Sequence, residues 1–208
     1  MDNRLSKINL ENLYWLGRYV ERVIITLDQI VDTFDEMLDK NPMAYQVFCE
    51  KIGITDTFKD GDHFLSEYIL NEALPYSMIS NINMAYQNAM VSRDILKIRC
   101  FGYLRNALSV LKKCDVTKIY TLKEVKDSLF AFWGSLQEYL ESQSVYSIIL
   151  MGKYVEKIDL GLRFQRGDMY RSWARLEWMM SHFEISLKYE EITLQGINSL
   201  FDRSFGES

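Results

Sequence analysis

The sequence predicts an all-α fold, a multi-helix bundle that contains an internal pseudo-duplication of one helix. Hydrophobic residues make up 48% of the chain and aromatic residues 13%, whereas the 208 residues include only 10 glycines and 2 prolines. This composition is typical of packed helices and argues against disorder or a β-sandwich. Over residues 13–34 apolar side chains recur every three or four positions, the spacing of an amphipathic helix, at Leu13, Leu16, Val20, Ile24, Leu27, Val31 and Phe34.

In the first half of the chain we expect one long helix followed by shorter ones. The long helix begins near residue 9 and ends before the dipeptide Asn41-Pro42, because the residue before a proline avoids helical backbone angles. Aromatic side chains also lie outside its main apolar face, so it is predicted to be a buried central helix. Ser77 is a candidate N-cap. Further helices are expected at about residues 43–51, 62–71 and 78–97, the last continuing or kinking near Gly102 to about residue 114.

Residues 115–120 form the expected boundary between the two halves of the chain. Thr121 and Glu124 have the spacing of a capping box, which predicts a helix that begins there and runs to about residue 142. The dipeptide Gly167-Asp168 predicts the end of one helix and the start of the next. We expect the remaining helices at about residues 145–165, 168–185 and 190–203.

One stretch of the long helix recurs in the second half. Residues 16–22, Leu-Gly-Arg-Tyr-Val-Glu-Arg, correspond to residues 151–157, Met-Gly-Lys-Tyr-Val-Glu-Lys, at a constant offset of 135 residues. Such a fixed register indicates duplication. We therefore expect a single domain over residues 1–208 that consists of two pseudo-repeats, 1–118 and 119–208.

Glycine stands at the same place in both copies, at Gly17 and Gly152. Inside a helix glycine costs about 1 kcal/mol relative to alanine. Its presence at one register of both copies predicts a close backbone approach there, either from a neighbouring helix or from a ligand.

Both copies also carry charges on an otherwise apolar helix: Arg18, Glu21 and Arg22 in the first, and Lys153, Glu156 and Lys157 in the second. Buried charges must be paired, so one hypothesis is a structural ion-pair network that joins the two helices. The alternative is that both copies converge on an anionic or peptide-like ligand. Asp159 and Arg163, four residues apart and on the same stripe as Glu156, predict a network within the second copy.

Residues 13–22, Leu-Tyr-Trp-Leu-Gly-Arg-Tyr-Val-Glu-Arg, resemble the signature of the bacterial Alpha-E domain family, helical proteins with a typically duplicated "ER" motif. Residues 75–94 and 152–163 resemble two further blocks of that family. The resemblance marks a second polar cluster, Asn88, Arg93 and Asp94, which by itself would be interpreted as a solvated helix face. The sequence departs from the family pattern at Ile24, Asp28, Gln87, Met90 and Lys157.

The resemblance implies an uncharacterised helical component of a peptide synthesis or modification system. Its implied companions are circularly permuted ATP-grasp ligases, transglutaminase-like proteins and an amino-terminal-nucleophile peptidase. The leading hypothesis is a non-catalytic binding or scaffold component that serves such a ligase, in which Arg18, Glu21, Arg22, Glu156 and Arg93 organise the interface or a bound peptide.

Two alternatives stay open. One is a peptide- or amide-modifying enzyme with Glu21 or Glu156 as general base, which requires a carboxylate in a cleft with a raised pKa. The other is a purely structural interaction subunit. A polar pocket open to solvent beside Glu21 would favour binding or catalysis, whereas a sealed ion-pair network would favour the structural role.

Several classes of function are not expected. The net charge of −5 argues against nucleic-acid binding, and no phosphate-binding loop motif is present. With only two histidines, His63 and His182, and no Glu-x-x-His pair, neither a metal site nor another cofactor is predicted. Cys49, Cys100 and Cys114 form no CxxC motif and are expected to be free thiols in a reducing compartment. Without a signal peptide or a long apolar run, we expect a cytoplasmic protein that does not interact with membranes.

Overall fold

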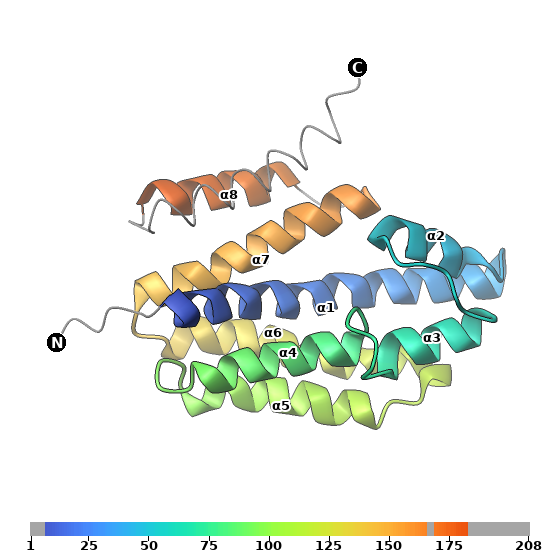
Figure 1. Ribbon diagram of the computed structural model, residues 1–208, viewed down its shortest axis with the longest axis horizontal. Helices are drawn as coiled ribbons and strands as arrows, with labels where there is room; N and C mark the ends of the chain where they lie inside the picture. Colours follow the sequence, from blue (N-terminus) through green and yellow to red (C-terminus); the bar gives the residue numbers. More distant parts are fainter. Residues whose placement is uncertain (1–6, 166–168, 183–208) are drawn as a thin grey trace, which may run out of the picture.

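The computed structural model describes residues 7–165 and 169–182, and all regular structure in these residues is helical (Figure 1). The prediction of an all-α helical bundle is confirmed. The helices are α1 (Lys7–Asp39), α2 (Ala44–Ile52), α3 (Gly61–Leu70), α4 (Met78–Val91), α5 (Ile98–Lys112), the 3-10 helix η1 (Val116–Leu122), α6 (Lys123–Tyr139), α7 (Gln143–Phe164) and α8 (Met169–His182).

Helix α1 lies at the centre of the bundle, as its apolar residues predict. Its most extensive contacts are with α7 and then α4, and it also packs against α2, α6 and η1. Figure 1 shows α7 and α8 on one side of α1, and α4, α5 and α6 on the other. The side chains of Leu13, Leu16 and Ile30 are completely buried. Burial of this apolar surface on several sides supplies the main driving force that holds α1 in place.

The backbones of α1 and α7 touch at the two glycines of the repeated sequence. A Cβ atom on Gly17 would lie 2.0 Å from the carbonyl oxygen of Ile149, and a Cβ atom on Gly152 would lie 2.0 Å from the carbonyl oxygen of Tyr14. These two contacts correspond under the 135-residue offset. The predicted close approach is thus confirmed, and the neighbour is a helix.

The prediction of one long helix through residue 97 is wrong, because the chain turns back between α4 and α5. The amides of Ile95 and Leu96 both donate to the carbonyl of Ser92 at 2.9 Å, which closes a tight turn. Leu96 is buried at this turn, and α5 packs against both α4 and α6. Burial of Leu96 and of one face of α5 outweighs continued helix formation. Gly102, the expected kink, lies inside α5 with open space around it.

The predicted capping box at Thr121 is also wrong. The Thr121 hydroxyl donates to the carbonyl of Lys118 at 2.7 Å within η1, and Leu122 precedes α6 with helical backbone angles. Because η1 runs directly into α6, no extended N-cap residue is present there. The predicted N-cap at Ser77 is confirmed, because its side chain accepts a hydrogen bond from the Ser80 amide. Ser142, which was not predicted as a cap, accepts from the Val145 amide and starts α7 slightly earlier than expected.

Helix α8 packs against α7 and covers most of the helix expected at residues 168–185. The predicted boundary at Gly167-Asp168 and the predicted helix over residues 190–203 lie outside the described residues. In the described part of the chain, none of the helices combines the length and the apolar character needed to cross a membrane.

The glycine contact leads to a prediction about stability. We expect Gly17→Ala or Gly152→Ala to lower the free energy of unfolding by about 3 kcal/mol, because an added methyl group pushes the α1 and α7 backbones apart. Gly134→Ala, an exposed position in α6 with open space, is the control and should raise stability by up to about 1 kcal/mol. Urea denaturation measures all three variants, and equal effects at the three positions would contradict the close packing.

Candidate functional site

The charges of the ER sequence meet beside the glycine contact, and they pair across the two helices in a reciprocal way. Arg18 and Arg22 of α1 bind Glu156 of α7. In turn, Lys153 and Lys157 of α7 lie near Glu21 of α1. The two carboxylates correspond under the same offset as the glycines. The structure therefore brings together six of the predicted site residues in what we call the ER cluster.

The arginine half of the ER cluster is tightly bonded. Arg18 Nε donates to Glu156 Oε2 at 2.6 Å, and Arg22 Nε donates to Glu156 Oε1 at 2.5 Å. The Glu156 side chain is 0% exposed, so neither of its oxygens contacts water. Guanidinium donors take the place of water at both oxygens. Burial alone would lower the pKa of Arg18, but the charge and hydrogen bond of Glu156 together with the charges of Tyr14 and Asp159 outweigh burial and raise that pKa. In this half, two charge-assisted arginine–carboxylate hydrogen bonds converge on one glutamate.

Two aromatic rings lie against the arginines. The Trp15 and Tyr19 rings stack with their centroids 5.5 Å apart. The guanidinium of Arg18 lies 5.2 Å from the Trp15 centroid, and that of Arg22 lies 5.9 Å from the Tyr19 centroid. Such cation–π contacts add stability and separate the pairs from water. The sequence alone does not predict this role, since the helical pattern only places both rings outside the main apolar face.

The lysine half is more loosely bonded. Lys157 Nζ lies 3.4 Å from one Glu21 oxygen and Lys153 Nζ 3.9 Å from the other. Glu21 Oε2 makes no hydrogen bond to any described group, although the residue is only 3% exposed. Lys153 instead lies 4.1 Å from the centroid of the Trp133 ring of α6.

The pKa shifts follow this difference in bonding. Burial raises the pKa of Glu21 despite the charges of Lys153 and Lys157, and burial lowers the pKa of Lys153 despite the charge of Glu21. Both shifts favour the neutral forms, because the attraction between these groups does not compensate for their loss of hydration. The two halves of the ER cluster thus have related sequences and different energetics.

Asp159 and Arg163 extend the ER cluster along α7. Arg163 Nε donates to Asp159 Oδ1 at 2.7 Å, which is the pair expected within the second copy. Asp159 also accepts a hydrogen bond from Arg18 at 3.3 Å, and Glu156 binds the arginines of α1. The network therefore joins α1 to α7 and is not internal to the second copy.

The other predicted polar cluster lies elsewhere. Arg93 and Asp94 are in the turn between α4 and α5, with side chains 67% and 94% exposed and a separation of 4.0 Å. Asn88 lies on α4, where its carbonyl accepts the Ser92 amide. The structure does not bring these three residues into contact with the ER cluster.

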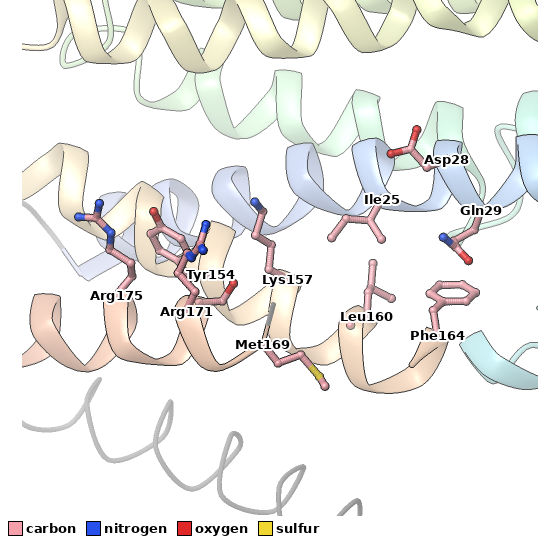
Figure 2. A pocket seen from close by; sticks show the side chains of 12 residues that line it. Ile25, Asp28, Gln29, Tyr154, Lys157, Leu160, Phe164, Met169, Arg171 and Arg175 are labelled. Carbon is pink, nitrogen blue, oxygen red and sulfur yellow. The ribbon is translucent and has the colours of Figure 1, made fainter. Parts of the chain in front are cut away.

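A groove lies next to the ER cluster, between α1, α7 and α8, with a volume of about 570 Å³ (Figure 2). Lys157 belongs to both features, since it lines the groove and pairs with Glu21. Figure 2 shows Tyr154, Arg171 and Arg175 close together toward one end and Phe164 toward the other. The groove is lined by Ile25, Asp28, Gln29, Tyr154, Lys157, Leu160, Gly161, Phe164, Met169, Arg171, Ser172 and Arg175.

A second cavity of about 300 Å³ shares Tyr154 and Arg175 with the groove and extends it toward Tyr146 and Trp178. Tyr154, Arg171 and Arg175 were not among the site residues predicted from the sequence. The four-residue spacing of the two arginines was the available signal, yet it indicates only that they share a helix face. Tertiary packing, which the spacing does not indicate, determines that this face of α8 meets α7.

The unequal halves of the ER cluster lead to a prediction. Glu156→Gln should lower the free energy of unfolding at neutral pH by about 3 kcal/mol, because it removes the carboxylate that two partly buried arginines share and leaves Arg18 only its longer contact with Asp159. Glu21→Gln should change it by less than about 1 kcal/mol. A carboxyl whose pKa is raised on folding is destabilising while ionised, and its amide avoids that penalty. Urea denaturation measures both variants, and equal losses of stability would contradict the described asymmetry.

Comparison with known proteins supports the assignment made from the residues. A family model, described as "Alpha-E: A predicted alpha-helical domain with a conserved ER motif", matches residues 5–198. No curated protein and no solved structure matches the chain significantly. The family match spans both copies of the repeated sequence and the ER dipeptide Glu21-Arg22, which the structure places at the helix crossing. The chain belongs to the Alpha-E family.

Proposed function

We propose that this protein is a helical binding component of a system that synthesises or modifies peptides, and that a peptide-like ligand binds in the α7–α8 groove. The groove itself supports this proposal most directly. Its volume of about 570 Å³ lies in the range of about 300–1,000 Å³ that is usual for ligand sites. Its lining combines basic, hydroxyl and apolar side chains, which is the combination that a peptide requires.

The proposed partners are an ATP-grasp-type ligase and a transglutaminase-like protein, as the resemblance to the family implies. In this account the protein holds a peptide while the ligase acts on it. The groove is partly open to solvent among the described residues, so a bound peptide would stay accessible to a partner enzyme. The ER cluster would then hold the helices that form the groove.

A catalytic role is the second candidate, because burial raises the pKa of Glu21 as a general base requires. Glu21 is only 3% exposed, however, and does not line the groove. Glu156 is held by two arginines and is even less accessible. Binding therefore accounts for the geometry better than catalysis, while a purely structural role accounts for the arginine half of the ER cluster and leaves the groove without a function.

A retention experiment tests the proposal. We expect the immobilised protein to retain a subset of a synthetic short-peptide library, identified by mass spectrometry, and to co-purify with an ATP-grasp-type ligase from its own host cell. Ser172→Trp should abolish peptide retention, because Ser172 lines the groove and a large side chain would fill it. Ala174→Trp, on the exposed face of the same helix, is the matched control and should retain the same peptides as wild type.

Two outcomes would contradict the proposal. One is that wild-type protein retains no peptide from the library. The other is that Ser172→Trp retains the same peptides as Ala174→Trp, which would place binding outside the groove.

A further inference from the structure

We infer that the ligand of the groove is a carboxylate-bearing peptide. Lys157 leaves Glu21 and, together with Arg175, binds the carboxylate of the peptide. An apolar side chain of the same peptide would lie against Leu160 and Phe164. This inference rests on the proposed peptide-binding function and adds the chemical class of the ligand, its orientation and the residues that select it.

The charge of the groove favours an anion. Among the described residues that line it, three are basic and one, Asp28, is acidic. Asp28 is already paired, because Lys126 Nζ lies 2.5 Å from its Oδ1. Arg175 is exposed and forms no ion pair with a carboxylate in the part of the chain that the structure describes. A guanidinium in this state presents the planar pair of donors that matches a carboxylate.

The lining changes from polar to apolar along α7. Tyr154, Lys157, Leu160 and Phe164 follow one another at intervals of three or four residues, so they lie on one stripe of the helix. Figure 2 shows Tyr154 near Arg171 and Arg175 at one end, and Phe164 near Gln29 at the other. A ligand that fits this order is amphipathic, with its negative charge near Arg175 and its apolar group near Phe164.

Lys157 connects the groove to the ER cluster. Its Nζ lies 3.4 Å from Glu21 Oε1, which is longer than the contacts in the arginine half, and its side chain is 40% exposed. The flexible stem of a lysine allows it to reorient. A ligand carboxylate in the groove would compete with Glu21 for this ammonium group, and Lys153 would remain beside Glu21 after the exchange.

Two parts of a peptide could supply the carboxylate. A C-terminal carboxylate would end the chain beside Arg175. A side-chain carboxylate would let the backbone continue past Tyr154 and Arg175 into the second cavity, toward Tyr146 and Trp178. Both sources share one chemistry, and the choice of probes distinguishes them.

Fluorescence anisotropy with short labelled peptides tests the inference on the full chain. The probes are a peptide that ends in Phe-Gln with a free C-terminus, one that ends in Phe-Glu as the C-terminal amide, and a neutral Phe-Gln amide. We expect at least one acidic probe to bind about tenfold more tightly than the neutral amide. The tighter acidic probe identifies the source of the carboxylate.

Variants then locate the interaction. Arg175→Ala should weaken binding of the acidic probe about fivefold, whereas Arg105→Ala, at an exposed position of α5, should leave it unchanged. Glu21→Gln should strengthen binding of the acidic probe about threefold, because it frees Lys157, and should not affect the neutral probe. Lys157→Met should reduce the preference for acidic probes without abolishing it, because Arg175 still lines the groove. This variant keeps the inference testable if Glu21→Gln fails to fold.

The outcomes that overturn the inference differ from those that overturn the proposed function. If neutral and acidic probes bind equally well and Ser172→Trp blocks both, the groove binds peptides without selecting a carboxylate. If acidic probes bind and Glu21→Gln has no effect on them, Lys157 does not exchange its partner. If none of the probes and no library peptide binds, the proposed function and the inference both fail.

Discussion

The contact between the α1 and α7 backbones at Gly17 and Gly152 is the constraint on which the rest of the structure depends. Each glycine faces a carbonyl oxygen of the other helix so closely that a side chain has no room. At this separation, the long charged side chains next to the glycines cannot avoid the facing helix. They must be paired, because an isolated charge on this largely buried surface would be strongly destabilising. The ER cluster thus results from the close approach of the two helices and also stabilises it.

The chemistry of arginine and lysine explains why the two halves of the ER cluster differ in the strength of their ion pairs. Two guanidinium groups satisfy both oxygens of Glu156, whereas two ammonium groups lie at longer range from Glu21 and leave one of its oxygens without a hydrogen bond. Figure 1 shows α7 moving away from α1 toward its C-terminal end. The groove lies in this part of the bundle, where α8 packs against α7. Lys157 lies at the junction, since it lines the groove and also belongs to the more loosely bonded half of the ER cluster.

Much of this arrangement could be predicted from local patterns. The shared register of the two copies predicted the glycine contact and indicated Arg18, Glu21 and Glu156 as candidate site residues. The register did not predict which charges pair, because Arg18 could equally have reached Glu21 on its own helix. The duplication of the two halves itself stays a prediction, although the reciprocal contacts are those that a duplicated helix would form.

Features that depend on long-range packing were missed for identifiable reasons. The break after α4 is stabilised by burial of Leu96 in a core that only the folded chain defines. The groove requires α8 to lie against α7 with Arg175 facing Tyr154, and helical periodicity gives the face of a helix without its neighbour. Trp133 comes from α6 and reaches Lys153 only in the assembled bundle.

Native-state hydrogen exchange at the crossing tests the central claim most directly. If the glycine contact and the ER cluster hold α1 and α7 as one unit, the amides of residues 16–23 and 151–158 will exchange only through global unfolding. Glu156→Gln will then lower the protection of both segments by the same free energy. The account would be contradicted if residues 151–158 exchanged through a smaller opening while residues 16–23 stayed fully protected, because α7 could then detach without α1.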